Sequence, residues 1–254
     1  KKEFTAKFVS NQKGKIELSS KEDSDKILKA LEGAVYTVSD VKTGVRKKSP
    51  APPFTTSTLQ QEASRRLGYQ SSRTMRIAQQ LYEGVDLEKL GATGLITYMR
   101  TDSLRVSEEA KAQARDYIKG KYSQDYLPEK PRFYAKKKGS QDAHEAIRHT
   151  SVDLTPQSVK ASLTSDQYRL YKLVWERFVA SQMSDAILDT AKVQITANGY
   201  LFGCSGYSVV FEGFTALYEM KEDNAEEDSS KLPKMAAGDN LKLMKLEDSQ
   251  HFTQ

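Results

Sequence analysis

The stretch RKKSPAPPFTTSTLQQEASRRLG, residues 46–68, separates two patterns in this sequence. Before it, short apolar segments such as 34–44 are typical of β strands, and after Thr56 the apolar residues recur at helical spacing. The three prolines between residues 50 and 53 force an extended backbone through which neither pattern can continue. We therefore predict a domain boundary at about residue 57.

Four helices are predicted after this boundary, each beginning beside a serine or threonine that can cap its first turn. The candidate caps are Ser57 or Thr58, Ser71 or Ser72, Ser107, and Thr164 together with Gln167. The helices end at about Leu67, Glu83, Tyr122 and Met183. The first two are separated by only a short turn, which is typical of a helix-turn-helix. That motif can present a helix to DNA, but it also occurs as a plain helical hairpin.

The pattern returns to β after about residue 184, in the segments 191–197, 200–213 and 239–247. Each terminal part of the chain is short for a core of its own, so we expect the two parts to form one domain. The predicted fold class is α+β with two domains. Residues 1–57 and 185–254 would form a mainly antiparallel β arch, and residues 58–184 an inserted, mainly α-helical domain with helix-turn-helix character.

Charge and composition limit the classes of function. The formal net charge is +5, and residues 58–184 carry 21 Lys and Arg against 15 Asp and Glu, which suits a polyanion partner or a solvated surface. No apolar run approaches the roughly 18 residues of a membrane span. The single cysteine, Cys204, excludes an internal disulfide, and the three histidines lack the spacing of a zinc site. We expect a cytoplasmic protein, excised from a longer one.

The stretch LITYMRTDS, residues 95–103, is a candidate catalytic segment. If it is a strand, Tyr98, Arg100 and Asp102 share one face, because alternate residues of a strand point the same way. Only about one phenol in a thousand is ionised at pH 7. A neighbouring guanidinium lowers the cost of ionisation and can hold phosphate oxygens. Tyr98 could therefore attack a phosphate, or it could simply pack its ring in a core.

A second cluster is AHEAIR, residues 143–148. If this segment is helical, His144 and Arg148 lie four residues apart on one face, a proton donor beside a permanent cation. Both groups suit a phosphodiester substrate. The alternative is that His144 pairs with a nearby carboxylate and has only a structural role.

Three stretches together closely resemble the bacterial type IA DNA topoisomerases, the topoisomerase I class: residues 51–68, 95–103 and 143–148. The resemblance implies that Tyr98 is the nucleophile that forms a 5′-phosphotyrosine link, that Arg100 stabilises the phosphate, and that His144 contacts the scissile region. It implies supporting, DNA-binding roles for Arg148, Asp102 and Glu145. One departure is His149, which stands where the family usually has proline.

The resemblance also implies an activity and its requirements. Such an enzyme relaxes negatively supercoiled DNA by transient single-strand cleavage, strand passage and religation without ATP. Its Mg²⁺ is bound by an N-terminal toprim domain that is not recognisable here, so we expect no metal site in this chain and no activity from the chain alone. The expected partners are a single-stranded DNA segment and the remaining domains of the same polypeptide, in the bacterial nucleoid, with no membrane.

Three other readings stay open from the sequence. The chain could be a non-enzymatic DNA-binding module that uses the helix pair at 57–83. It could be a purely structural gate whose binding surface forms only against other domains. A reverse gyrase could also be the parent enzyme, since that enzyme is a related type IA protein.

Overall fold

The computed structural model describes residues 3–11, 14, 20–88, 90–134, 144–218 and 232–248, and shows two compact units. The first, here the sheet unit, comprises residues 1–47, 187–210 and 221–254; the second, the helical unit, comprises 48–186 and 211–220. The predicted α+β class is confirmed. The predicted domains, 1–57, 58–184 and 185–254, stay a prediction, because compactness alone does not establish that a unit folds by itself.

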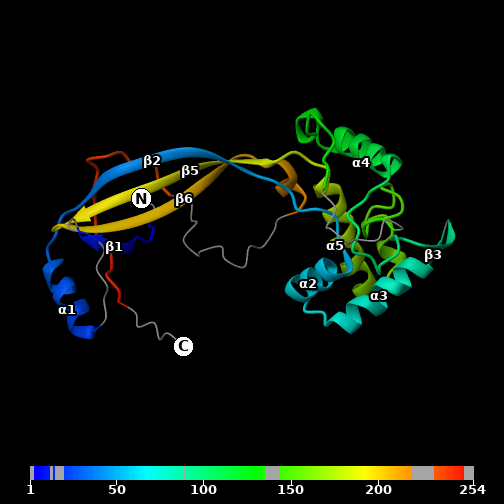
Figure 1. The fold of residues 1–254 in the computed structure, drawn as a ribbon, viewed down its shortest axis with the longest axis horizontal. Coiled ribbons are helices and arrows are strands. Elements are labelled where there is room, and N and C mark those ends of the chain that lie inside the picture. Colours follow the sequence, from blue (N-terminus) through cyan, green and yellow to red (C-terminus); the bar gives the residue numbers. More distant parts are fainter. Residues whose placement is uncertain are drawn as a thin grey trace. The chain divides into compact units, whose positions relative to one another are not determined.

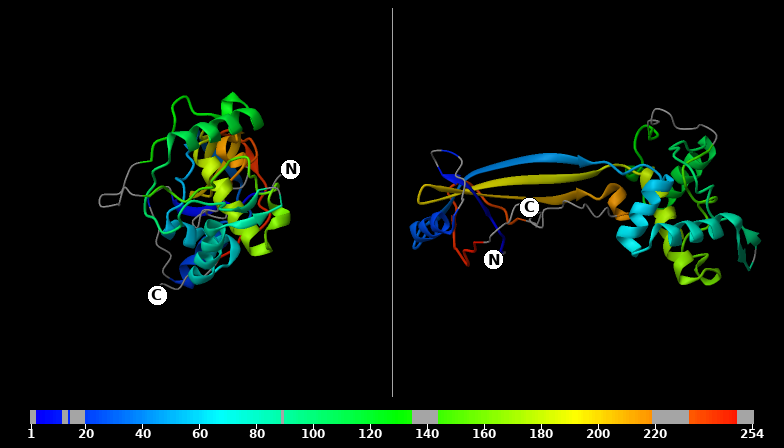
Figure 2. Two further views of the ribbon diagram at one scale, coloured as in Figure 1. Left: turned by 90° about the vertical axis from the view of Figure 1, so that its right-hand side faces the viewer. Right: turned by 60° about the horizontal axis from the view of Figure 1, so that its bottom comes forward.

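The sheet unit contains five strands in the order β1-β6-β5-β2-β7. Their bounds are β1 (Lys7–Asn11), β2 (Tyr36–Lys48), β5 (Ala186–Ala197), β6 (Tyr200–Phe211) and β7 (Asn240–Leu241). The pairs β1 with β6 and β2 with β7 are antiparallel, and two views show β2, β5 and β6 side by side (Figures 1 and 2). Strands from both ends of the chain therefore meet in one sheet, although only two residues of the predicted strand 239–247 are regular.

A small apolar core covers one face of this sheet. Helix α1 (Lys21–Ala30) begins at Ser20, whose hydroxyl accepts a bond from the backbone N–H of Asp23. The core residues alternate along β2 and β5, as expected for strands with one buried face. They are Leu31, Tyr36, Val38, Val193, Ile195, Ala197 and Phe202. Between β5 and β6, Asn198 and Gly199 have φ of 44° and 81°, the left-handed values that a tight two-residue hairpin turn requires.

The helical unit contains α2 (Thr56–Leu67), α3 (Ser71–Glu83), α4 (Glu108–Lys121) and α5 (Ser165–Ser181), with a small hairpin of β3 (Val85–Leu87) and β4 (Gly91–Thr93). Short 3₁₀ turns lie at Gln124–Tyr126, Lys160–Ser162 and Gly213–Ala216. The caps at Ser107 and Thr164 are confirmed. The cap of α2 was predicted wrongly, because Thr55 and Thr58 form the reciprocal capping box. None of the helices in the described ranges is long and apolar enough to cross a membrane.

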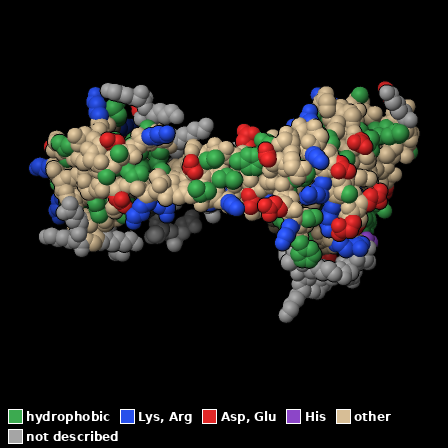
Figure 3. All heavy atoms as spheres, turned by 90° about the horizontal axis from the view of Figure 1, so that it is seen from above, with side chains coloured by type: hydrophobic (Ala, Val, Ile, Leu, Met, Phe, Trp, Pro, Cys, Tyr) green, Lys and Arg blue, Asp and Glu red, His purple; other side chains and the backbone are tan. Residues whose placement is uncertain are grey.

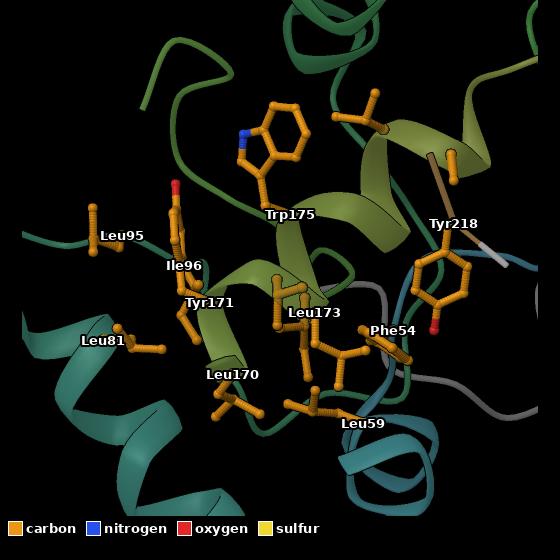
Figure 4. Packing of buried hydrophobic residues seen from close by; sticks show 14 of the residues in the cluster. Phe54, Leu59, Leu81, Leu95, Ile96, Leu170, Tyr171, Leu173, Trp175 and Tyr218 are labelled. Carbon is orange, nitrogen blue, oxygen red and sulfur yellow. The ribbon is translucent and has the colours of Figure 1, made fainter. Parts of the chain in front are cut away.

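Helix α5 is the centre of the helical unit, with side chains from every neighbouring segment packed around it (Figure 4). Leu170, Tyr171, Leu173 and Trp175 meet Phe54, Leu59, Leu81, Leu95, Ile96 and Tyr218 in one buried cluster. Arg177 is only 6% exposed, and its Nε donates to the carbonyl of Pro52 at 2.7 Å. Its Nη1 donates to the hydroxyl of Tyr218 at 3.3 Å. The buried guanidinium of Arg177 thus joins the segment at Pro52, where the chain enters the helical unit, to the segment at Tyr218, where the chain returns to it.

His149 is the exceptional polar residue of this core. It is 1% exposed, and neither ring nitrogen has a hydrogen-bond partner among the described residues. Its ring lies 4.8 Å from that of Phe178 and 5.9 Å from that of Trp175, centroid to centroid. Burial, and then the charge of neighbouring Arg148, lower the pKa of the His149 imidazole to about 3. The imidazole is therefore a neutral packing group at pH 7 and is not placed to transfer protons.

Burial of His149 predicts a specific dependence of stability on pH. The unfolded chain, with a histidine pKa near 6.5, takes up the proton first as the pH falls, so folded stability is lost progressively between about pH 6.5 and pH 3. From pH 7.5 to pH 5 the loss from this group is about 2 kcal/mol. The measurement is urea unfolding at both pH values, followed by the fluorescence of Trp175, the single tryptophan.

The substitution His149→Leu should remove this part of the pH dependence, while the same substitution at exposed His144 should retain it. An unchanged pH dependence in His149→Leu would contradict the assignment.

Candidate active site

Three segments far apart in the sequence are joined here by backbone hydrogen bonds. The N–H of Ile147 donates to the carbonyl of Phe54 at 2.8 Å, and the N–H of Thr97 donates to the carbonyl of Arg148 at 2.9 Å. Isolated β bridges pair Phe54 with Ile147 and Ile96 with His149. The segment 144–150 thus connects the start of α2 with the segment that contains Tyr98.

The segment 95–103 is not the strand that the alternation predicted. Only Ile96 forms a bridge, and a bend follows at Met99 and Arg100. The local pattern is overridden because Thr56 at the first turn of α2 holds the chain: its hydroxyl donates to the carbonyl of Met99 at 2.8 Å and accepts from the N–H of Thr101 at 2.8 Å. The argument that alternate residues share a face therefore does not apply to this segment.

Tyr98 is half-buried, and its ring contacts two other aromatic rings. The His144 ring centroid lies 4.9 Å away with the planes tilted by 40°, and the Tyr82 centroid lies 5.5 Å away in an edge-to-face arrangement. The hydroxyl of Tyr98 makes no hydrogen bond within the described residues. The structure therefore brings together Tyr98 and His144, two of the three predicted catalytic residues.

Arg100 and Asp102 have exposed side chains. No hydrogen bond, ion pair or ring contact joins Arg100 to Tyr98 in the part of the chain that the structure describes. The exposed guanidinium of Arg100 is open to solvent. The direct contact that we expected between the Tyr98 phenol and the Arg100 guanidinium is not formed among the described residues.

The segment 144–148 is not helical, which corrects the second expectation. Its backbone is extended by the pairing with Phe54 and Ile96, so His144 and Arg148 do not share a helix face. Instead Arg148 donates from Nε and Nη2 to one carboxylate oxygen of Glu145, at 2.9 and 2.7 Å, and from Nη1 to the carbonyl of His149 at 2.8 Å. Arg148 and Glu145 therefore form a partly buried clamp beside exposed His144.

Sequence reasoning missed three residues that shape this site. Tyr82 contacts the Tyr98 ring, and Thr56 fixes the bend after it. The hydroxyl of Thr97 donates to the carbonyl of Ala146 at 2.8 Å and accepts from the N–H of Arg148 at 3.0 Å. The sequence did contain a signal for the two threonines, because both lie inside the motifs. A threonine hydroxyl can satisfy backbone groups where regular structure ends.

The described residues do not fit a resident metal ion. Among them, no three His, Cys, Asp or Glu side chains gather closely enough to hold one. Glu145 is engaged by Arg148, and Asp102 stands alone on the surface. No chemical step of this site is therefore assigned to a metal bound by the described part of the chain.

Comparisons with known proteins show the family of this chain. A family model described as DNA topoisomerase matches residues 1–254, the whole chain. The full-length topoisomerase I from Thermotoga maritima is similar in structure, with a TM-score of 0.74 and 36% sequence identity. That match covers 90% of this chain and 36% of the Thermotoga chain, so this chain spans little more than a third of that protein.

The matched family, the shared fold and the three motifs at the site lead to one conclusion. The chain belongs to the bacterial DNA topoisomerase family, with the fold of a type IA topoisomerase fragment.

Proposed function

We propose that this chain is the strand-cleaving part of a type IA DNA topoisomerase, with Tyr98 as the nucleophile. The observation that supports this most is the environment of Tyr98: a half-buried ring, fixed by two aromatic neighbours, whose hydroxyl has no hydrogen-bond partner in the described residues. A tyrosine with a purely structural role usually satisfies its hydroxyl when its ring is packed. Here the reactive atom is left for a ligand.

The proposed reaction is a transesterification on one DNA strand. The phenol oxygen of Tyr98 forms a bond to the scissile phosphorus, and the bond from phosphorus to the 3′ oxygen of the preceding nucleotide breaks. The phenol loses its proton, and the departing 3′ oxygen gains one. One phosphodiester is exchanged for another, so the reverse attack by the 3′ hydroxyl restores the strand without ATP.

Arg100 and His144 suit the charge changes of this reaction. Both are exposed, and the His144 ring contacts that of Tyr98, so its nitrogens lie near the proposed path of the proton. The guanidinium of Arg100 can pair with the nonbridging phosphate oxygens as charge builds on them. We assign Glu145 and Arg148 a supporting role: their clamp fixes the backbone that carries His144. For Asp102 we retain only the expected supporting contact with DNA.

The helix pair α2 and α3 gives less support to a simple DNA-binding module. Arg66 is paired with Glu62 at 2.8 Å, and Arg73 with Asp166 at 2.7 Å, so part of the cationic charge of these helices is already neutralised. On the face of the helical unit opposite α2 and α3, at the right of Figure 3, cationic and anionic side chains are also interspersed. Nonspecific DNA binding normally uses a more continuous positive surface.

The matched topoisomerase I extends well beyond the region that this chain covers, and we propose that cleavage requires those further domains. Magnesium would be held there, in a toprim domain, and the DNA strand would lie between that domain and Tyr98. In the complete enzyme the helical unit would move away to let a second strand pass before resealing.

The first prediction from this proposed function concerns the nucleophile, Tyr98. In the complete polypeptide, Tyr98→Phe should abolish the covalent protein–DNA adduct, because phenylalanine keeps the ring contacts and removes only the reacting oxygen. The adduct is measured by denaturing electrophoresis of an end-labelled single strand. Tyr168→Phe is the matched control, a partly exposed tyrosine of the same unit whose ring contacts Lys160. A surviving Tyr98→Phe adduct would show that the nucleophile lies elsewhere.

The second prediction concerns the chain alone. Residues 1–254 should leave supercoiled plasmid unrelaxed in the presence of Mg²⁺, because the described residues lack an acidic metal cluster. Agarose gel electrophoresis of the plasmid checks this, with the complete polypeptide as the positive control. Relaxation by the chain alone would refute the proposed need for further domains.

The third prediction separates DNA contact from a purely structural gate. Titration of the chain with single-stranded DNA at several salt concentrations should give a falling affinity, with a slope of roughly −0.7 per neutralised phosphate in a plot of log affinity against log salt. Arg100→Gln should reduce that slope by about one such unit. A flat response would favour the structural gate.

A further inference from the structure

Tyr98 is the shared member of two ring pairs, and one of its partners has no role in the proposed reaction. His144 carries ring nitrogens that can transfer a proton, but Tyr82 lies on α3 with its ring edge-to-face with Tyr98, at 5.5 Å and an interplanar angle of 68°. Tyr82 is 41% exposed. Its ring is therefore accessible at the surface, and it meets the candidate site through its contact with the Tyr98 ring.

The backbone also holds Tyr82 and Tyr98 in a fixed relation. The N–H of Leu95 donates to the carbonyl of Leu81 at 2.7 Å, which attaches the Tyr98 segment to the last turn of α3. A side chain at Gly94 would place its Cβ 2.8 Å from the carbonyl oxygen of Tyr82. The glycine therefore permits a close approach that any other residue would disturb. The two tyrosines are thus coupled through both their rings and their backbones.

Residues 97–100 form no regular strand or helix, so regular secondary structure does not set the position of the Tyr98 ring. The ring must be held by contacts if its oxygen is to approach phosphorus in line with the leaving oxygen. Small errors in such an approach are costly to a reaction rate. The contact with Tyr82 limits rotation of the ring on the side of α3.

We propose that Tyr82 is a positioning residue for the Tyr98 phenol, which its ring holds in the orientation for attack. This inference rests on the proposed function of Tyr98. The aromatic ring of Tyr82, and not its hydroxyl, is the group that holds the Tyr98 phenol. Tyr82 would therefore affect the rate of the cleavage step and not the affinity for DNA.

The test compares Tyr82→Leu and Tyr82→Phe in the complete polypeptide. With a single-stranded oligonucleotide under saturating, single-turnover conditions, Tyr82→Leu should form the adduct about tenfold more slowly, the loss expected for one aromatic pair. Tyr82→Phe should stay within about twofold of the unchanged protein, since it retains the ring. The dissociation constant for the same oligonucleotide, measured in a Tyr98→Phe background, should be unchanged in both variants.

The matched control is Tyr207→Leu, at a tyrosine of similar exposure (37%) in the sheet unit, which should have no effect. Urea unfolding followed at Trp175 should show that Tyr82→Leu is still fully folded under the assay conditions, although loss of the ring pair lowers its midpoint, so that a slow rate is not misfolding. An unchanged cleavage rate in Tyr82→Leu would overturn the inference. A weakened dissociation constant with an unchanged saturating rate would also overturn it, and would make Tyr82 a contact for a DNA base.

The outcome of Tyr98→Phe separates this inference from the proposed function. If Tyr98→Phe still forms the adduct, the proposed function fails and the inference falls with it. If Tyr98→Phe abolishes the adduct while Tyr82→Leu cleaves at the normal rate, only the role of Tyr82 is refuted.

Discussion

The candidate site depends on the backbone hydrogen bonds of residues 146–150. Within these five residues the chain bonds to Phe54 before α2, to Leu95 and Thr97 beside Tyr98, and to Arg105 ahead of α4. Each such bond satisfies a backbone group that would be costly to bury unpaired. No regular sheet is formed, yet three segments separated by about 40 to 90 residues are fixed against one another. The rings of Tyr98 and His144 meet because of this pairing.

Packing beneath the pairing keeps it in place. The apolar side of α5 lies under Phe54, Leu95 and Ile96, so the same segments that exchange hydrogen bonds also share one core. His149 shows the cost of this arrangement, since a buried imidazole with no hydrogen bond to the described part of the chain occupies a place that an apolar residue could fill. Arg148, next to it, pairs its charge with Glu145 in a mostly buried contact.

The features predictable from the sequence were those that local physics decides. A serine before an acidic first turn placed the start of α4, and the pair Thr164 and Gln167 placed the start of α5. Alternating apolar residues identified the long strands β2 and β5. The conformation of the two candidate catalytic segments could not be predicted in this way, because it comes from distant partners: Thr56 bends the chain after Tyr98, and Phe54 extends the chain after His144. The motifs identified the residues, and only the structure gave their conformation.

The central claim is that Tyr98 becomes covalently attached to a DNA strand, and peptide mapping tests it most directly. Cleavage complexes of the complete polypeptide would be trapped with denaturant, digested with nuclease and trypsin, and analysed by mass spectrometry. Trypsin should release residues 90–100, which contain Tyr98 as their single tyrosine. A residual nucleotide mass is expected on that peptide, localised to Tyr98 by fragmentation. The same mass on any other residue, with residues 90–100 unmodified, would contradict the claim.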